Sequence, residues 1–254
     1  MPDSGVLVFD SDEVSEFTIT VACECHNDVE IVGKALAQLP AFNGNLAWGS
    51  PHKPDPAKLV SDSELVLIVS DKAHLAVAID RWAAYRQAEQ ASLLVYLQDD
   101  EDGLAKQIPG LSLSRSCLAS GFTALTHALF TPVIPQGLVC IDWADTRHLF
   151  VMDGQMVVTE ASGSQPELAI DAAVTRLREL ASGRHILGLQ ASILYGRKLT
   201  MRHVHHLVSA CKAMLEEDRL LIVGSPFLDC PAFGQCEVRI AARVACSPGL
   251  DTRS

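Results

Sequence analysis

Apolar residues along the first half of the chain fall into short continuous runs and longer stretches with helical spacing. Residues 65–69 and 93–97 are uninterrupted apolar runs, typical of strands buried on both faces of a parallel sheet. The β-branched segment 17–22 predicts a strand ahead of them. Residues 28–39 and 73–91 have the spacing of amphipathic helices. Strand, helix, strand, helix, strand in this order predicts a parallel α/β sheet.

The second half repeats this alternation. Residues 116–130 predict an apolar helix that ends before Pro132. Pro166 and Gly183 mark the start and end of another helix, because proline suits the first helical turn and glycine the position past the last. Residues 6–9 are an expected edge strand, and residues 40–60, which contain four prolines, are expected to be mostly loop. Further strands are expected at 156–159, 186–193, 220–224 and 236–245, and further helices at 166–181 and 200–215.

Composition narrows the class of protein. With 254 residues, 48% hydrophobic and 20% charged, the chain is expected to be globular, with one domain or two. No apolar run is long enough to span a bilayer, and the first residues lack the features of a signal peptide, so the expected location is the cytoplasm. The net charge of -11 and the lack of a clustered Lys/Arg face argue against nucleic acid or an anionic membrane surface as a partner.

Residues 137–145 carry the most specific motif in the chain. They read Gly-Leu-Val-Cys-Ile-Asp-Trp-Ala-Asp. This segment resembles the Gly-Leu-x-Asn-x-Asp-Phe-Ala-Asp loop of the bacterial division protein FtsZ, by which one subunit reaches into the nucleotide site of its neighbour in a filament. Both acidic positions are kept as Asp142 and Asp145, and Cys140 stands at the position of the asparagine.

Four more segments resemble FtsZ in the same order along the chain: residues 121–125, 161–163, 222–225 and 239–244. They are similar to the end of the central helix, the Ala-Ser-Gly that ends the next strand, the Val-Ile-Gly-Thr strand and the last strand. The resemblance implies an α/β fold of the tubulin/FtsZ type. It implies a reduced N-terminal parallel-sheet domain over residues 1–115, a connecting helix over 116–136 and a C-terminal α/β sheet domain over 137–254.

The phosphate-binding loops of the family are missing. The first should follow the strand at 17–22, where residues 22–27 match the family only at Asn27 and Glu24 puts a negative charge where phosphate would sit. The second, Gly-Gly-Gly-Thr-Gly-Thr-Gly in the family, should follow residues 65–69, yet no glycine occurs from residue 50 to 102. Glycine is needed there because a Cβ would keep backbone N–H groups from closing on phosphate. The chain is therefore expected to be a pseudo-GTPase without a cofactor and without GTP hydrolysis.

A retained acidic loop beside a lost nucleotide site predicts a nucleotide-independent protein of cell division that binds FtsZ filaments or self-assembles and so regulates filaments. In the family, the paired acids polarise the water that attacks the neighbour's γ-phosphate, a role that carboxylates suit. Here Asp142 and Asp145 are expected to be catalytically vestigial. The plainer alternative is that Asp145 caps a following helix and Asp142 is a turn residue. The predicted interface residues are Gly137, Leu138, Cys140, Asp142, Trp143 and Asp145.

Two other functions remain open. A divergent GTPase with a remodelled phosphate site would use Lys72, at the start of the helix after residues 65–69, because a helix N-terminus with a lysine can hold an anion. A thiol or metal protein would use Cys23, Cys25 and His26. No second pair of ligands occurs at zinc-finger spacing, so a pair of buried thiols is favoured and no metal is expected.

Two further clusters have an ordinary and a functional interpretation. His203 and His206 are three residues apart on a predicted helix, and a solvated histidine face is favoured over a metal site. A group of cationic and aromatic residues lies on the helix predicted at 73–91. Packing between surface and core is favoured there over an interface anchor. The group consists of Arg81, Trp82, Tyr85 and Arg86.

Overall fold

The structure, a computed structural model, describes residues 5–11, 14–23, 46–49, 65–98, 108–114, 118–129, 133, 137–195, 199–226 and 235–246. The chain divides into two compact units, residues 1–123 and 124–254. The boundary falls within helix α4, which spans Leu118–Leu129. The predicted helix at 28–39 lies outside the described residues.

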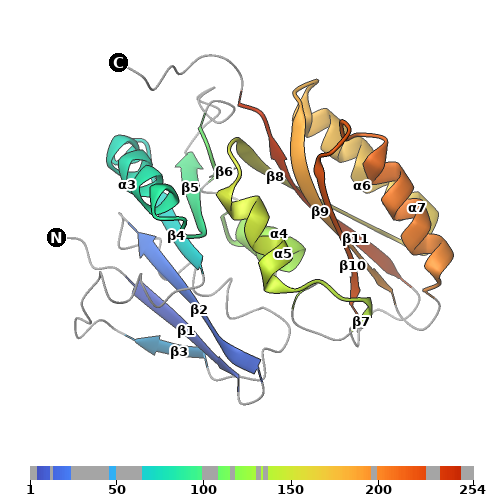
Figure 1. Cartoon of the computed structure of the whole chain (residues 1–254), viewed down its shortest axis with the longest axis horizontal. Helices are drawn as coiled ribbons and strands as arrows, with labels where there is room; N and C mark the ends of the chain where they lie inside the picture. Colours follow the sequence, from blue (N-terminus) through green and yellow to red (C-terminus); the bar gives the residue numbers. More distant parts are fainter. Residues whose placement is uncertain are drawn as a thin grey trace. The chain divides into compact units, whose positions relative to one another are not determined.

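The first unit contains an α/β sheet (Figure 1). Within the unit the strand order is β3-β1-β2-β4-β5-β6, with β2, β4, β5 and β6 parallel and β1 antiparallel to both of its neighbours. Its elements are β1 (Gly5–Ser11), β2 (Val14–Cys23), β3 (Leu46–Gly49), β4 (Leu65–Ser70), α3 (Leu75–Gln87), β5 (Ser92–Gln98) and β6 (Leu111–Ser114).

The parallel arrangement of β2, β4 and β5 confirms the sequence-based prediction. The apolar runs form strands β4 and β5, whose residues from Leu65 to Val69 and from Leu93 to Leu97 are buried. Trp82 of α3 packs on these strands. Strand β3 was not predicted; it lies in the proline-rich segment that was expected to be mostly loop. Its four residues are too few for an alternating pattern to stand out, and prolines flank the strand without interrupting it.

The second unit contains a mixed sheet with the strand order β8-β11-β9-β10-β7. Strand β9 is parallel to β10 and antiparallel to β11, and β11 is also antiparallel to β8. Its elements are β7 (Gly137–Val139), α5 (Trp143–Val151), β8 (Gln155–Gly163), α6 (Pro166–Ala181), β9 (Ile186–Tyr195), α7 (Met201–Lys212), β10 (Leu220–Pro226) and β11 (Cys236–Val244).

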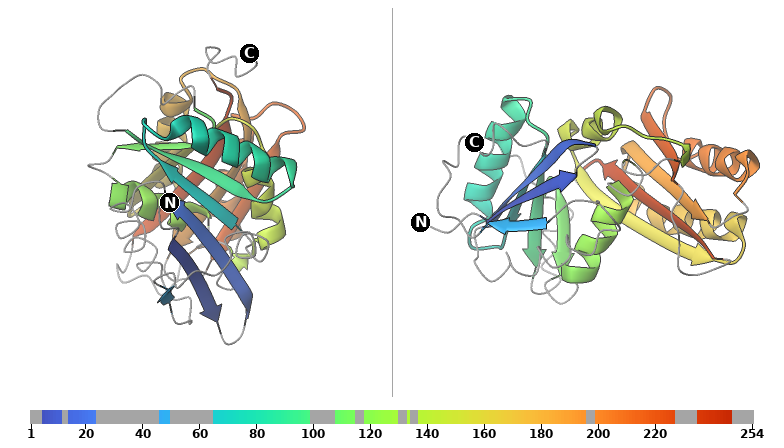
Figure 2. Two further views of the ribbon diagram at one scale, coloured as in Figure 1. Left: turned by 90° about the vertical axis from the view of Figure 1, so that its left-hand side faces the viewer. Right: turned by 90° about the horizontal axis from the view of Figure 1, so that it is seen from below.

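The side chains of β9 show how the two faces of this sheet differ. Leu189, Ala191 and Ile193 belong to the apolar core shared with α6 and α7, which lie on one face (Figures 1 and 2). Gln190 points to the opposite face, where it meets α5. Side chains alternate between faces along a strand, so a buried polar residue in an apolar strand reaches only the elements on its own side. This face positions the segment that carries the family motif.

Candidate functional site

The motif segment is largely regular structure. Its first three residues form β7, which pairs antiparallel with Ser225 and Pro226 of β10. Cys140 and Ile141 link this strand to α5, which begins at Trp143. The expected loop is therefore a short strand and the first turn of a helix, joined by a link too short to move independently of either.

Asp142 is the N-cap of α5. Its backbone is extended, with φ -94° and ψ 168°, and its Oδ1 accepts the Asp145 N–H at 2.8 Å. The first backbone N–H groups of a helix have no partner within the helix, and an aspartate at the N-cap satisfies one of them. The expectation that Asp145 caps the helix was therefore wrong: Asp142 is the cap. Asp145 lies in the first turn, where its charge complements the positive end of the helix dipole.

The two acidic residues of the segment are exposed, whereas Ile141 and Trp143 next to Asp142 pack against the protein. Asp142 and Asp145 are both exposed. Ile141 is buried, and Trp143 is half-buried with its ring 5.6 Å from that of Phe150. Leu138 on β7 is 40% exposed. The segment thus contains two exposed carboxylates and one exposed apolar side chain, together with residues that are buried or half-buried.

Two buried polar residues that the sequence reasoning missed hold α5 in place. Gln190 of β9 accepts a hydrogen bond from Thr146 at 2.8 Å. Arg243 of β11 donates from Nε to the Leu149 carbonyl at 2.7 Å and from Nη1 to the Gly154 carbonyl at 3.0 Å. Strand β11 also contains Glu237 and Arg239, so its sequence does not single out Arg243. For Gln190 the available signal was a polar residue inside an apolar strand. Such a residue indicates a buried hydrogen-bonding role without naming the partner.

The position of the second phosphate loop is occupied by a tight turn. Strand β4 ends at Ser70, and residues 72–74 form a turn that leads directly into α3. The carboxylate of Asp71 accepts the backbone N–H of His74 at 3.1 Å and lies 2.8 Å from its Nδ1. Lys72 is exposed. A carboxylate of the chain itself thus accepts one backbone N–H at this helix N-terminus, an end that otherwise favours anions.

His203 and His206, which were weighed as a solvated histidine face or a metal site, both lie near carboxylates of α6. His203 lies with its Nε2 3.6 Å from Glu167, and His206 with its Nε2 3.2 Å from Asp171, so each histidine faces an acid of α6. Within the described part of the chain, no group of three or more His, Cys, Asp or Glu side chains has the geometry to hold a metal ion. Cys25, His26 and the side chain of Cys23 lie outside the described residues.

In the aromatic and cationic group on α3, the two aromatic residues pack against the core of the first unit. Trp82 is 6% exposed and packs against β4 and β5, with Tyr85 partly buried beside it. The guanidinium of Arg86 lies 5.0 Å from the centre of the Trp82 ring, as in a cation–π contact. Packing between surface and core, rather than an interface anchor, therefore describes these residues.

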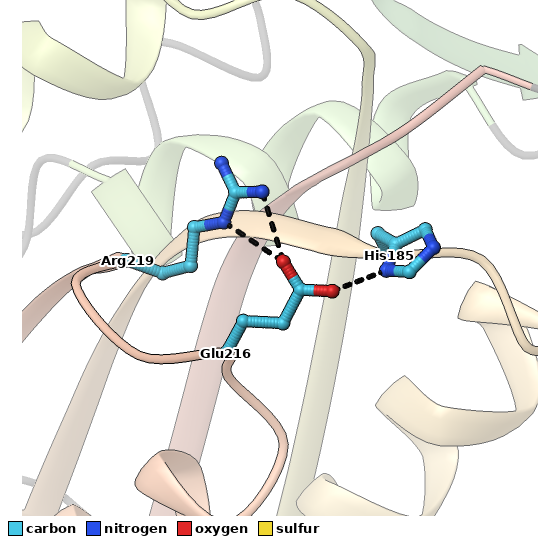
Figure 3. Close-up of polar contacts among 3 residues, drawn as sticks. All are labelled: His185, Glu216 and Arg219. Atoms are coloured by element: carbon cyan, nitrogen blue, oxygen red, sulfur yellow. Dashed lines mark hydrogen bonds and ion pairs between the residues drawn. The ribbon is translucent and has the colours of Figure 1, made fainter.

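An ion-pair cluster that the sequence reasoning missed joins two loops of the second unit (Figure 3). The carboxylate of Glu216 lies 2.6 Å from Nδ1 of His185 and 2.9 Å from Nη2 of Arg219. The hydrogen bond from Arg219, followed by that from His185, lowers the pKa of Glu216. All three residues are exposed. The cluster ties the turn after α7 to the start of β9, and exposed pairs of this kind contribute little to stability.

Cysteine labelling distinguishes the exposed motif cysteine from the core cysteines. Burial raises the pKa of the Cys211 and Cys236 thiols to about 12. Cys140 is exposed. The thiolate is the reactive form, so at about pH 8 we expect iodoacetamide to modify Cys140 first and to reach the other two only after unfolding. Peptide mass spectrometry over a time course measures this order, and simultaneous modification of all three would contradict the packing described here.

Several solved structures have a similar fold. A variant of FtsZ from M. jannaschii matches with a TM-score of 0.58 at 12% identity, covering 77% of this chain and 68% of that one. An empty FtsZ dimer from M. jannaschii matches with a TM-score of 0.55 at 12% identity, covering 77% and 66%. CetZ2 from Haloferax volcanii, in a GTPγS-bound protofilament, matches with a TM-score of 0.54 at 12% identity, covering 76% and 69%.

The chain has the tubulin/FtsZ fold. The predicted fold class is thereby confirmed, at an identity that supports the fold alone. The chain spans about two thirds of the length of these FtsZ and CetZ structures. No protein-family model matches the sequence, and the comparison with curated proteins gives no match. Among the described residues of this FtsZ-like chain, no helix has the length and apolar character needed to cross a membrane.

Proposed function

We propose that the chain is a nucleotide-independent, FtsZ-like protein of the cytoplasm that acts by binding FtsZ filaments, or copies of itself, through the acidic face around Asp142 and Asp145. One observation carries this proposal. At the N-terminus of α3, where the family's second phosphate loop would stand, the carboxylate of Asp71 accepts the backbone N–H of His74.

The donated side of the contact supports the proposal. Asp142 and Asp145 are exposed at the start of α5, as the family's acidic pair would need to be to reach a neighbouring subunit. Leu138 adds an exposed apolar side chain in the same segment. Apolar and charged groups together suit a protein interface with a dry centre and a polar rim. Such an interface would need about 800 Å² on each partner.

The turn between β4 and α3, where the family's second phosphate loop would receive the nucleotide, supports nucleotide independence. A phosphate placed at the N-terminus of α3 would lie next to Asp71, which already accepts the His74 N–H. Two like unit charges about 4 Å apart repel by about 4 kcal/mol at an effective dielectric constant near 20. A repulsion of that size weakens binding by several hundredfold or more. No glycine is present here to bring further N–H groups to the phosphate.

The acidic face and the altered turn before α3 lead to different abilities to bind another subunit. A subunit that offers the acidic face adds to the end of a filament where a nucleotide site is open. Because its own receiving side lacks a nucleotide, it does not readily accept the next subunit through a nucleotide-bridged contact. The expected action is therefore to cap or regulate filaments rather than to extend them, and GTP hydrolysis by this chain is not part of it.

Neutralising the acidic face tests the proposal. In Asp142→Asn/Asp145→Asn both charges are lost, while asparagine keeps the N-cap hydrogen bond because it is as good a cap as aspartate. We expect wild-type protein to co-sediment with GTP-assembled FtsZ of the source organism. We expect the double variant to bind at least about tenfold more weakly, a difference of about 1.4 kcal/mol. The control Glu179→Gln/Asp218→Asn removes two exposed charges elsewhere on the second unit and is expected to bind like wild type.

Two results would contradict the proposal. The first is unchanged co-sedimentation of the double variant. The second is wild-type protein that neither co-sediments nor self-associates in analytical ultracentrifugation. The alternative, a divergent GTPase with a remodelled phosphate site, is favoured by the exposure of Lys72 beside the α3 N-terminus. It requires saturable GTP binding that Lys72→Ala abolishes.

A further inference from the structure

We infer that Gln190 is the positioning residue of the acidic face: its side-chain amide joins α5 to the C-terminal end of α4 and so fixes where Asp142 and Asp145 are held. Gln190 touches neither carboxylate and acts through α5. The functional use of this positioning rests on the proposed function, whereas the positioning itself is a property of the isolated chain.

Both ends of the Gln190 amide are engaged. The side chain is fully buried on the face of β9 that is turned away from α6. Its Nε2 donates to the carbonyls of Ala128 at 3.2 Å and Leu129 at 3.0 Å, the last two residues of α4. The last carbonyls of a helix have no partner within the helix, so this amide satisfies groups that burial would otherwise leave without one.

The direction of the hydrogen-bond chain is fixed by chemistry. Backbone carbonyls only accept, so the NH₂ group of Gln190 must face α4 and its oxygen must face α5. The Thr146 hydroxyl therefore donates to Gln190 Oε1, at 2.8 Å. Thr146 is itself fully buried. A flipped amide would set an oxygen against two carbonyls and an N–H donor against the hydroxyl, so one orientation is strongly preferred.

Thr146 connects this chain to the acidic pair. It lies directly after Asp145, and its backbone N–H bonds to the Asp142 carbonyl at 3.3 Å in the first turn of α5. Arg243 holds the same helix near its other end through the Leu149 carbonyl. Two fixed points on one nine-residue helix set both its position and its rotation about its axis. The Gln190 contact is the nearer of the two to the carboxylates.

Matched substitutions separate positioning from general stability. Thr146→Val keeps the shape and loses the donor, Thr146→Ser keeps the donor, and Gln190→Met keeps the length and loses the amide. Hydrogen exchange of the α5 amides is compared with that of the β9 and β11 amides, together with the NMR shift of the Asp145 amide proton. In Thr146→Val and Gln190→Met we expect α5 protection to fall about tenfold more than strand protection and the Asp145 signal to move. Thr146→Ser is expected to resemble wild type.

Should Gln190→Met not fold, Gln190→Asn serves in its place, because its shorter amide cannot reach both helices. Protection that falls equally in α5 and the strands, or a Thr146→Ser variant that behaves like Thr146→Val, would overturn the inference. Co-sedimentation of the same variants keeps the two proposals apart. If the variants show the expected loss of α5 protection but wild-type protein does not bind, only the proposed function is contradicted. If wild-type protein binds but no variant loses α5 protection selectively, only the positioning role is contradicted.

Discussion

Replacing Arg243 by methionine is expected to lower the free energy of unfolding by about 3–5 kcal/mol. Arg243 has no exposed surface and donates to the carbonyls of Leu149 and Gly154. Methionine has a similar length but no donor, so both carbonyls would stay buried without this partner. The Leu149 carbonyl also lies in the last turn of α5, where a cation is favoured by the helix dipole.

Urea unfolding followed by circular dichroism measures this change, with the slope of the transition checked for two-state behaviour. Arg176→Met is the matched control. Arg176 also donates to a backbone carbonyl, that of Glu160, but it does so from an exposed position. Water can replace a donor there, so we expect a loss of about 1 kcal/mol or less. Equal effects of the two substitutions would contradict a buried structural role for Arg243.

Gly154→Ala is expected to be the second severe change, with a loss of about 2–5 kcal/mol. Gly154 has φ +97°, a conformation that side chains disfavour. An added Cβ would also lie 2.4 Å from the Val244 carbonyl oxygen, and that oxygen belongs to the backbone of β11. The strand would have to move, although it pairs with β8 and β9 on both sides.

Gly183→Ala is the control that separates the cost of a positive φ from the cost of a steric clash. Gly183 has φ +76°, yet a Cβ added there meets nothing within 4 Å. It therefore carries the conformational cost alone, about 1–2 kcal/mol. Thermal unfolding of both variants by calorimetry gives the comparison. If Gly154→Ala proved as stable as Gly183→Ala, the backbone of β11 would move without cost, and the predicted effect of the contact with the Val244 carbonyl would be wrong.

Local chemistry explains which elements the sequence could predict. Helix α6 has the predicted bounds because Pro166, the apolar spacing and Gly183 all act within the helix or next to it. Strands β4 and β5 were predictable because burial on both faces demands continuous apolar runs. Strand β7 was expected to be loop because three residues carry too little pattern, and its pairing depends on β10, far along the chain.

The site was predictable in its residues and less so in its mechanics. The resemblance identified the acidic pair, and the missing glycines identified the altered α3 N-terminus. The roles within the pair were wrong, because two aspartates three residues apart both suit a helix start and only the backbone shows that Asp142 is the N-cap. Gln190 could not be assigned from sequence, since its partners lie 44 to 62 residues away.

Calorimetric titration of the purified chain with GTP and Mg²⁺ tests the central claim most directly. With the Asp71 carboxylate at the α3 N-terminus and no glycine loop after β4, we expect no saturable heat up to millimolar nucleotide. The titration is read together with the co-sedimentation of wild type and the Asp142→Asn/Asp145→Asn variant, which reports on the acidic face independently. Saturable binding in the nanomolar to micromolar range, lost in Lys72→Ala, would contradict nucleotide independence and would make the protein a GTPase with a remodelled phosphate site.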